Sequence, residues 1–279
     1  MSDTPAKKPP SNLVVRLATA LVAAPLILGL LYRGPAWGFY LLVLPAALVG
    51  ASELFAMTHA RDRFAQVIGV ALTAGVSLSI YLLGADPRVP MTVVAVASVL
   101  GPLLTLARLG DISTAALRAT AMGVGPLFVG VPMTLLAMLR RDTGPDGASY
   151  VLMTLMFAWF SDTGGYFAGR YFGKRKLYEA VSPKKTIEGA IGGLIAAAFG
   201  ACLAHFWFLR SIPLWHALPL SLVAAALGQA GDLGESLIKR SVGVKDSGHI
   251  VPGHGGILDR VDALLMTSTV VYLYTIWLR

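Results

Sequence analysis

The sequence contains nine segments of mostly apolar residues, and this repetition limits the possible folds more than any other feature. A helix needs roughly 20 such residues to cross the hydrocarbon core of a bilayer. The segments cover approximately residues 13–32, 36–57, 64–84, 90–107, 119–139, 148–168, 186–209, 214–238 and 256–278. They predict an all-α, polytopic integral membrane protein with nine transmembrane helices.

The composition supports a membrane protein over a soluble one. Only 14% of the residues are charged, against about 25% in an average soluble domain, and the mean hydropathy is +0.69. The net charge of +8 does not indicate a nucleic-acid partner, because many of the basic residues cluster in two loops between apolar segments. The single cysteine, Cys202, excludes an internal disulfide.

The basic residues also predict an orientation in the cell (inner) membrane. With the N-terminus in the cytoplasm, 17 of the 23 Lys and Arg residues fall on the cytoplasmic side, as the positive-inside rule requires. The C-terminus then lies outside. We expect a disordered tail (1–12), a five-span region (13–139) and a four-span catalytic region (140–279) with cytoplasmic loops at 169–185 and 239–255.

The stretch GQAGDLGESLIKR places ionisable residues at the end of an apolar segment. Asp232, Ser236 and Lys239 recur at helical spacing and therefore share one face, with Glu235 beside them. Ionisable groups at such a depth are costly and usually face a cavity or a partner. A structural ion pair of Asp232 or Glu235 with Lys239 is an equally simple interpretation.

The following stretch, GHIVPGHGGILDRVD, combines glycines with histidines. Gly255 and Gly256 would let backbone N–H groups approach an anion closely, although a turn that re-enters the membrane explains them as well. His249 and His254 lack the further soft ligands that a zinc site needs. His254 is as compatible with a structural role or a hydrogen bond to phosphate as with proton transfer.

Two carboxylates follow these glycines. Asp259 and Asp262 stand three residues apart and share one side of the last predicted helix. Hard carboxylate oxygens suit Mg²⁺, which binds through one or two carboxylates together with substrate phosphates. Because the segment after Asp232 can fold back, we expect Asp232 and Asp259 to meet at the cytoplasmic face.

A second charged loop ends in SPKKT. Lys184 and Lys185 stand directly before a predicted helix whose N-cap is Thr186, and a helix N-terminus attracts anions. A basic loop that only sets topology or contacts anionic lipid is the alternative. For the glycines that follow we predict close helix packing. They are Gly189, Gly192 and Gly193.

Both loops supply cations for phosphates, and the stretches around them supply carboxylates for a divalent metal. Phosphoryl and nucleotidyl transfer need this combination, because their catalysis is mostly positioning and charge neutralisation. The sequence has neither a Walker A motif nor a Rossmann glycine fingerprint, which excludes the two common soluble nucleotide-binding folds.

The stretch SLIKRSVGVKDSGHIVPGHGGILDRVD resembles the C-terminal motif of phosphatidate cytidylyltransferases, the CDP-diacylglycerol synthases. The stretches SDTGGYFAGRYFGKRKL, SPKKTIEG and GDLGES are also similar to that family. The resemblance covers roughly the C-terminal half, and the first five apolar segments match only in hydropathy. The matching residues in the first stretch are Ser236, Lys239, Arg240, Lys245, Asp246, Pro252, His254, Gly255, Gly256, Asp259, Arg260 and Asp262.

The resemblance implies that CTP and phosphatidate react to CDP-diacylglycerol and pyrophosphate in phospholipid biosynthesis. It implies Mg²⁺ as cofactor and leaves a second cation open, and it implies a homodimer in the lipid bilayer with no nucleic-acid partner. Asp232 and Asp259 are the expected metal ligands. The expected catalytic residues are Asp232, Lys239, Asp259 and Asp262. The expected substrate-binding residues are Lys184, Lys185, Arg240, Lys245, His254, Gly255, Gly256 and Arg260.

Two other functions are compared with this one. A CTP-dependent polyprenol or lipid kinase would use the same donor and similar charges. A secondary transporter would carry polar residues and broken helices at the bilayer midplane, together with repeated halves. Here the charges gather at one face and the sequence shows no such repeat, so a transporter fits less well.

Overall fold

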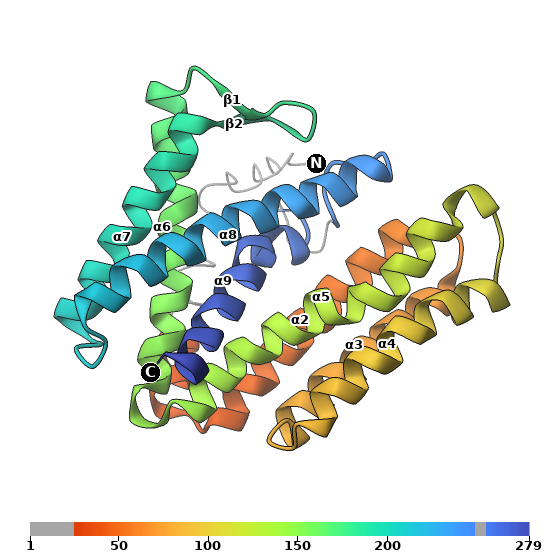
Figure 1. The fold of residues 1–279 in the computed structure, drawn as a ribbon, viewed down its shortest axis with the longest axis horizontal. Coiled ribbons are helices and arrows are strands. Elements are labelled where there is room, and N and C mark those ends of the chain that lie inside the picture. The colour runs from red at the N-terminus through yellow and green to blue at the C-terminus, as the bar shows by residue number, and fades with distance from the viewer. Residues whose placement is uncertain (1–24, 249–254, 279) are drawn as a thin grey trace, which may run out of the picture.

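The computed structural model describes residues 25–248 and 255–278, and it is almost entirely helical (Figure 1). Residues 25–33 are helical, and the rest of the first predicted span lies largely outside the described residues. The other eight predicted segments are each a helix, with ends within four residues of the prediction. These helices are α2 (Ala36–Thr58), α3 (Arg63–Leu83), α4 (Arg88–Ala107), α5 (Ala115–Asp142), α6 (Gly147–Phe172), α7 (Ile187–Trp207), α8 (Leu214–Ser241) and α9 (Leu258–Trp277).

Six helical stretches are long and apolar enough to cross a membrane, which confirms an all-α polytopic membrane protein. They are α2, α3, α4, α7, α8 and the continuous stretch Ile112–Asp142, in which a 3-10 turn (Ile112–Thr114) leads into α5. Helices α6 and α9 have 26 and 20 residues but fall outside this set. The count of nine spans therefore stays a prediction.

Helix α5 lies at the centre of the structure. It packs against α2, α3 and α4 on one side and against α6 and α9 on the other, while α7 and α8 complete the second group (Figure 1). Val129, Ala137 and Leu139 of α5 are fully buried in the core. The chain thus forms an N-terminal group, α2–α5, and a C-terminal group, α6–α9, that share α5 as the common wall.

Helices α6 and α7 pack closely through glycines, as predicted. A side-chain carbon at Gly192 would overlap Ala168, and one at Gly189 would come within 2.9 Å of the Gly165 carbonyl oxygen. At Gly193 a side chain would meet Gln229 of α8 at 2.6 Å. The absence of side chains at these positions lets the two helix backbones approach and leaves room for polar side chains from α8.

The loop predicted at 169–185 is shorter than expected and contains a β-hairpin. Helix α6 continues to Phe172, and strands β1 (Lys176–Tyr178) and β2 (Ser182–Thr186) then pair antiparallel. Thr186 caps α7 as predicted, because its side-chain oxygen accepts the Gly189 N–H at 3.1 Å. The hairpin therefore delivers Lys184 and Lys185 to the start of α7.

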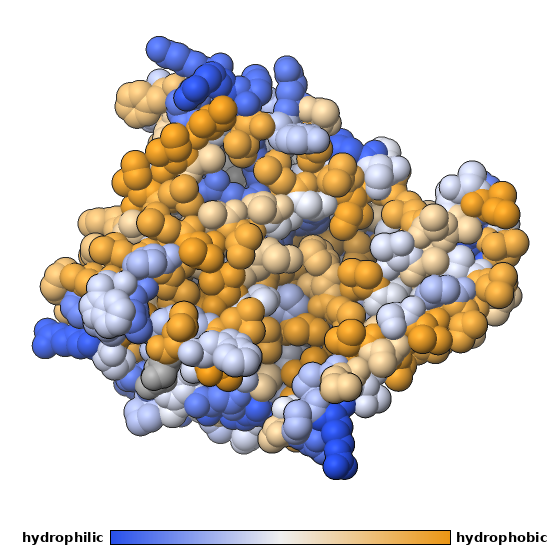
Figure 2. Space-filling view, in the orientation of Figure 1, coloured by the Kyte–Doolittle hydropathy of each residue, from blue (hydrophilic) through white to orange (hydrophobic). Residues whose placement is uncertain are grey.

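The surface has an apolar middle between polar ends. Figure 2 shows hydrophobic residues over the flanks of the helices and hydrophilic residues at the hairpin end and at the opposite end. Exposed aromatic side chains lie near both polar ends. Trp207, Trp215 and Trp277 are exposed at one end, and Tyr171 and Phe172 at the hairpin end. Such aromatic belts are typical of the two membrane–water interfaces.

Candidate active site

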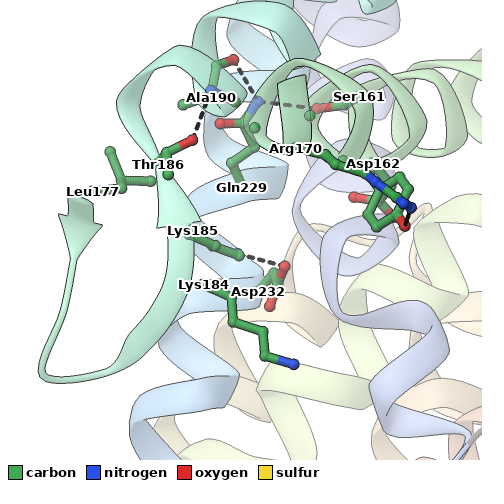
Figure 3. Close-up of a pocket in the computed structure, with 14 residues that line it drawn as sticks. Ser161, Asp162, Arg170, Leu177, Lys184, Lys185, Thr186, Ala190, Gln229 and Asp232 are labelled. Atoms are coloured by element: carbon green, nitrogen blue, oxygen red, sulfur yellow. Dashed lines mark hydrogen bonds and ion pairs between the residues drawn. The ribbon is translucent and has the colours of Figure 1, made fainter. Parts of the chain in front are cut away.

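A cavity of about 410 Å³ opens between α6, the β-hairpin, α7 and α8 (Figure 3). Its volume lies in the range of small-molecule sites. Its lining includes two lysines, Lys184 and Lys185, and two aspartates, Asp162 and Asp232. Lysines from the loop before α7 and Asp232 of α8 therefore meet at one cavity.

The basic side of the cavity comes from strand β2. Lys185 forms an ion pair with Asp232 of α8, and the two side chains point toward each other in Figure 3. Lys184 also lines the cavity, is exposed, and makes no ion pair with any residue in the described ranges. One lysine thus holds a carboxylate in place, and the other leaves its ammonium group available for an anion.

The base of the hairpin is held by Glu188 in the first turn of α7. Its carboxylate accepts the Lys174 and Arg175 N–H groups at 3.0 and 3.2 Å and the Arg175 Nε at 3.2 Å. Three donors on one carboxylate fix where the hairpin leaves α6 and enters α7. The position of Lys184 is therefore set by the backbone of the hairpin rather than by an ion pair of its own.

The acidic side of the cavity comes from α6 and α8, and a carboxylate of α9 lies near them. Asp162 of α6 lies close enough to Asp232, Lys185 and Arg260 to interact with them electrostatically. Asp262 of α9 accepts the Ala263 N–H at 2.7 Å. It also interacts electrostatically with Asp232 and Asp162. Carboxylates from three helices thus lie near one another, with Lys185 and Arg260 as cations beside them.

A neutral polar group lies deeper on the same wall. Gln229 donates from Nε2 to Ser161 Oγ at 3.0 Å and to the Ala190 carbonyl oxygen at 3.1 Å (Figure 3). Because a carbonyl oxygen only accepts hydrogen bonds, this contact fixes the orientation of the amide. These bonds connect α6, α7 and α8 beside the cavity.

A second charged cluster continues along α8 and reaches α9. Lys239 is buried, with Nζ 2.6 Å from Asp259 Oδ1 and 3.1 Å from Glu235 Oε1. Both Glu235 oxygens are buried without a hydrogen bond of normal geometry, so the nearby ammonium group of Lys239 is their compensating charge. The intrahelical pair considered from the sequence is therefore present, and it is shared with Asp259.

Asp259 also organises the segment before α9. Its Oδ2 accepts the Ser247 N–H at 3.0 Å and the Gly256 N–H at 2.9 Å. Gly255 has φ +79°, a conformation that favours glycine, and a side chain there would meet Asp259 at 2.7 Å. The two glycines are thus required for close approach of the backbone to a carboxylate of the chain itself.

Four further residues were predicted to bind substrate. Arg240 donates to the carbonyl oxygens of Val181 at 3.4 Å and Val244 at 3.1 Å, so it braces the hairpin against the end of α8. Lys245 and Arg260 are exposed. His254 lies outside the described residues. The substrate-binding role of all four stays a prediction.

The carboxylates Asp232 and Asp259 keep acceptor positions that could bind Mg²⁺. Asp259 uses three of the roughly four acceptor positions of a carboxylate, and Asp232 keeps the positions that Lys185 does not occupy. Within residues 25–248 and 255–278, no group of three or more His, Cys, Asp or Glu side chains is placed to hold a metal together. The donor chemistry fits Mg²⁺ that takes its other ligands from water and phosphate. Asp232 and Asp259 as its ligands stay a prediction.

The structure adds residues that the predicted site did not include. Asp162 and Gln229 line the cavity, and Glu53 of α2 contacts the segment around Asp259. Asp162 and Glu53 each interrupt an apolar segment with a carboxylate, which is a sequence signal for a functional or buried polar site. Gln229 carries no comparable signal.

Comparisons with known proteins extend the resemblance to almost the whole chain. The model of the cytidylyltransferase family matches residues 14–278. A phosphatidate cytidylyltransferase of Staphylococcus aureus is 32% identical over 262 residues, which cover 90% of this chain and 94% of that protein. One of Staphylococcus epidermidis is also 32% identical, with the same coverage of both chains.

A phosphatidate cytidylyltransferase of Staphylococcus saprophyticus is more similar over a shorter range. It is 44% identical over 128 residues, which span 46% of this chain and about half (49%) of that protein. The expectation that the first five segments match only in hydropathy is wrong, because the family match begins at residue 14 and includes them. The family match includes the helices that build the cavity and covers almost the whole chain, so the chain belongs to the cytidylyltransferase family.

Proposed function

We propose that this protein transfers the cytidylyl group of CTP to phosphatidate and produces CDP-diacylglycerol and pyrophosphate. The observation that carries this proposal is the cavity lined by Lys184 and Lys185 together with Asp162 and Asp232, in which Lys185 pairs with Asp232. Its combination of cations and carboxylates suits a bound triphosphate with a divalent metal. The names of the relatives support the choice of substrates.

The reaction balances without a redox step. An oxygen of the phosphatidate phosphate attacks the α-phosphorus of CTP, which forms a new P–O bond. The bond from the α-phosphorus to the oxygen that bridges it to the β-phosphorus breaks, and pyrophosphate leaves. A phosphate monoester has a second pKa of about 6, so it is largely dianionic at neutral pH and needs no general base.

The side chains of the cavity reduce the repulsion between two anionic substrates. Lys184, which has no counter-charge among the described residues, would bind phosphate oxygens, and Lys185 would be shared between Asp232 and phosphate. Asp232 and Asp259 would hold Mg²⁺. When bound, Mg²⁺ would neutralise phosphate oxygens and stabilise the leaving group.

The cellular arrangement follows from the same proposal. We place the cavity, the hairpin and the N-terminus on the cytoplasmic side of the cell membrane, where CTP is available, and the C-terminus outside. The distribution of Lys and Arg supports this orientation. A homodimer and a second cation remain expectations from the family resemblance.

Two forms of labelled CTP test the reaction directly. Purified protein in detergent is incubated with Mg²⁺ and phosphatidate, with the label on either the α- or the γ-phosphate of CTP. We expect the α-label to enter the lipid fraction and the γ-label to leave as pyrophosphate, with no transfer in EDTA.

Polyprenol serves as the alternative acceptor in the same assay. Transfer of the γ-label to a lipid would mean that the protein is a kinase and would overturn the proposal. Absence of any lipid product with phosphatidate would also contradict it.

A further inference from the structure

Glu53 is a charged residue in an otherwise apolar helix of the N-terminal group. It is the only ionisable acidic or basic side chain in α2, and it is 4% exposed. Burial of a carboxylate is costly unless hydrogen bonds compensate for it. Glu53 therefore needs hydrogen-bond donors among its neighbours.

Three hydrogen bonds in the described ranges connect Glu53 to the far end of the chain. Its Oε1 accepts the Ile257 N–H at 3.0 Å, and its Oε2 accepts the Leu258 N–H at 2.8 Å. Oε2 also accepts the Ser247 hydroxyl at 3.0 Å. Two of the donors are backbone groups at the start of α9, where a negative charge is favoured by the helix dipole.

Two glycines make this contact possible. A side chain at Gly256 would overlap both Ser247 Oγ and Glu53 Oε2, and one at Gly248 would come within 2.7 Å of Glu53 Oε1. The backbone therefore closes around the carboxylate from both sides. The two glycines and the Glu53 carboxylate therefore fit together more closely than ordinary helix packing requires.

Glu53 and Asp259 bind the same two ends of one segment. Ser247 donates its N–H to Asp259 and its hydroxyl to Glu53, so it is held by both carboxylates. At the other end, Gly256 donates to Asp259 while Ile257 donates to Glu53. Asp259 in turn pairs with the buried Lys239.

We propose that Glu53 is a positioning residue of the active site, which clamps Ser247 to the start of α9 and thereby sets the place of Asp259 and Lys239. This inference rests on the proposed function for its effect on catalysis. It gives the N-terminal group an indirect part in catalysis, although Glu53 lies about 200 residues from the residues it positions.

Glu53→Gln tests the clamp with little change in shape. The amide replaces one acceptor oxygen by a donor, so at least one of the three N–H or O–H groups faces another donor. Loss of one hydrogen bond to a charged group should lower kcat by about 10- to 100-fold. The KM for CTP should change little, because Glu53 does not touch the substrate. The value of kcat is normalised to the folded fraction from size-exclusion chromatography.

Ser247→Ala and Asp62→Asn give graded comparisons. Ser247→Ala removes one of the three bonds, so its kcat should lie between those of Glu53→Gln and the wild type. Asp62→Asn removes another carboxylate of the N-terminal group, which pairs with Arg108 and touches none of these residues. Its kcat should equal that of the wild type.

Hydrogen–deuterium exchange supplies a readout that does not depend on activity. Peptides that cover 242–248 and 255–262 should exchange faster in Glu53→Gln than in wild-type protein, whereas α6 and α7 should not change. Wild-type kcat per folded molecule in Glu53→Gln, with or without faster exchange, would overturn the positioning role. If wild-type protein makes no CDP-diacylglycerol, the proposed function fails, and unchanged exchange in Glu53→Gln would separately remove the clamp.

Discussion

The N-terminal helices α2–α5 and the C-terminal helices α6–α9 use charged side chains in different ways. In the N-terminal group, Asp62 caps α3 and pairs with Arg108 at 2.8 Å outside the apolar segments. Arg118 donates to the carbonyl oxygens of Arg108 and Asp111 in the turn before α5. These contacts complete the hydrogen bonding of helix ends and turns, and Glu53 is the exception.

In the C-terminal group the charges lie between helices and along a cavity. Lys185 pairs with Asp232 across the hairpin and α8, and Lys239 pairs with Asp259 across α8 and α9. Partial burial makes such pairs costly to form and strong once formed. The two groups therefore differ in where their charges lie relative to the helix interfaces rather than in the number of charges.

The largest effect is expected at the aspartates of the C-terminal group. Asp232→Asn and Asp259→Asn keep the side-chain size but remove the charge, so each should lower kcat by orders of magnitude and raise the KM for CTP less. If both residues hold one metal, as proposed, the double variant should be little worse than either single variant. Steady-state kinetics with CTP and phosphatidate provide the measurement.

A purely structural role for these aspartates predicts a different result. Loss of Asp259 would leave Lys239 buried with Glu235 alone and would reduce the amount of folded protein. Folded Asn variants with near-normal turnover and unchanged Mg²⁺ dependence would therefore remove the contrast between the two groups.

A smaller effect is expected at the lysines of the hairpin. Lys184→Gln removes a cation that has no partner within the described part of the chain, so it should raise KM for CTP or phosphatidate by about tenfold with membrane insertion intact. Lys185→Gln should also lower kcat, because Asp232 loses its ion pair. Wild-type kinetics for the double variant would mean that the loop is only a topology signal.

Local sequence patterns predicted the helices well, because hydropathy over about 20 residues reports the need to avoid water. The N-cap at Thr186 and the close packing at Gly189 and Gly192 were predicted for similar local reasons. The hairpin was not predicted, because strands of three and five residues are too short to show an alternating pattern.

Long-range contacts account for the rest. The charged motifs identified Asp232, Lys239 and Asp259, but the partners of these residues depend on how the helices pack. The carboxylate of Glu53 in an apolar segment is a local signal, but its role was missed because its donors at Ser247 and Leu258 follow it by 194 and 205 residues. No local pattern contains such a contact.

The smallest effect is expected at the surface pair of the N-terminal group. The hydrogen bond from Arg108 lowers the pKa of Asp62. Its contribution to stability is therefore present above the unfolded pKa of about 4 and is lost as pH falls through the lower folded value. Asp62→Asn should leave turnover within about twofold of wild type. In detergent, the unfolding temperature of Asp62→Asn should be slightly lower than that of the wild type near pH 7. This difference should disappear at acidic pH.

Binding of CTP with and without Mg²⁺ can be measured without turnover. If the proposed function is correct, the cavity of the C-terminal group holds a triphosphate through its lysines and through a metal at Asp232. Calorimetric titration of wild-type protein and of Asp232→Asn, each with Mg²⁺ and with EDTA, measures the gain in affinity due to the metal. We predict that Mg²⁺ strengthens CTP binding to the wild type and that Asp232→Asn removes most of this gain. An equal gain in both proteins would contradict the claim.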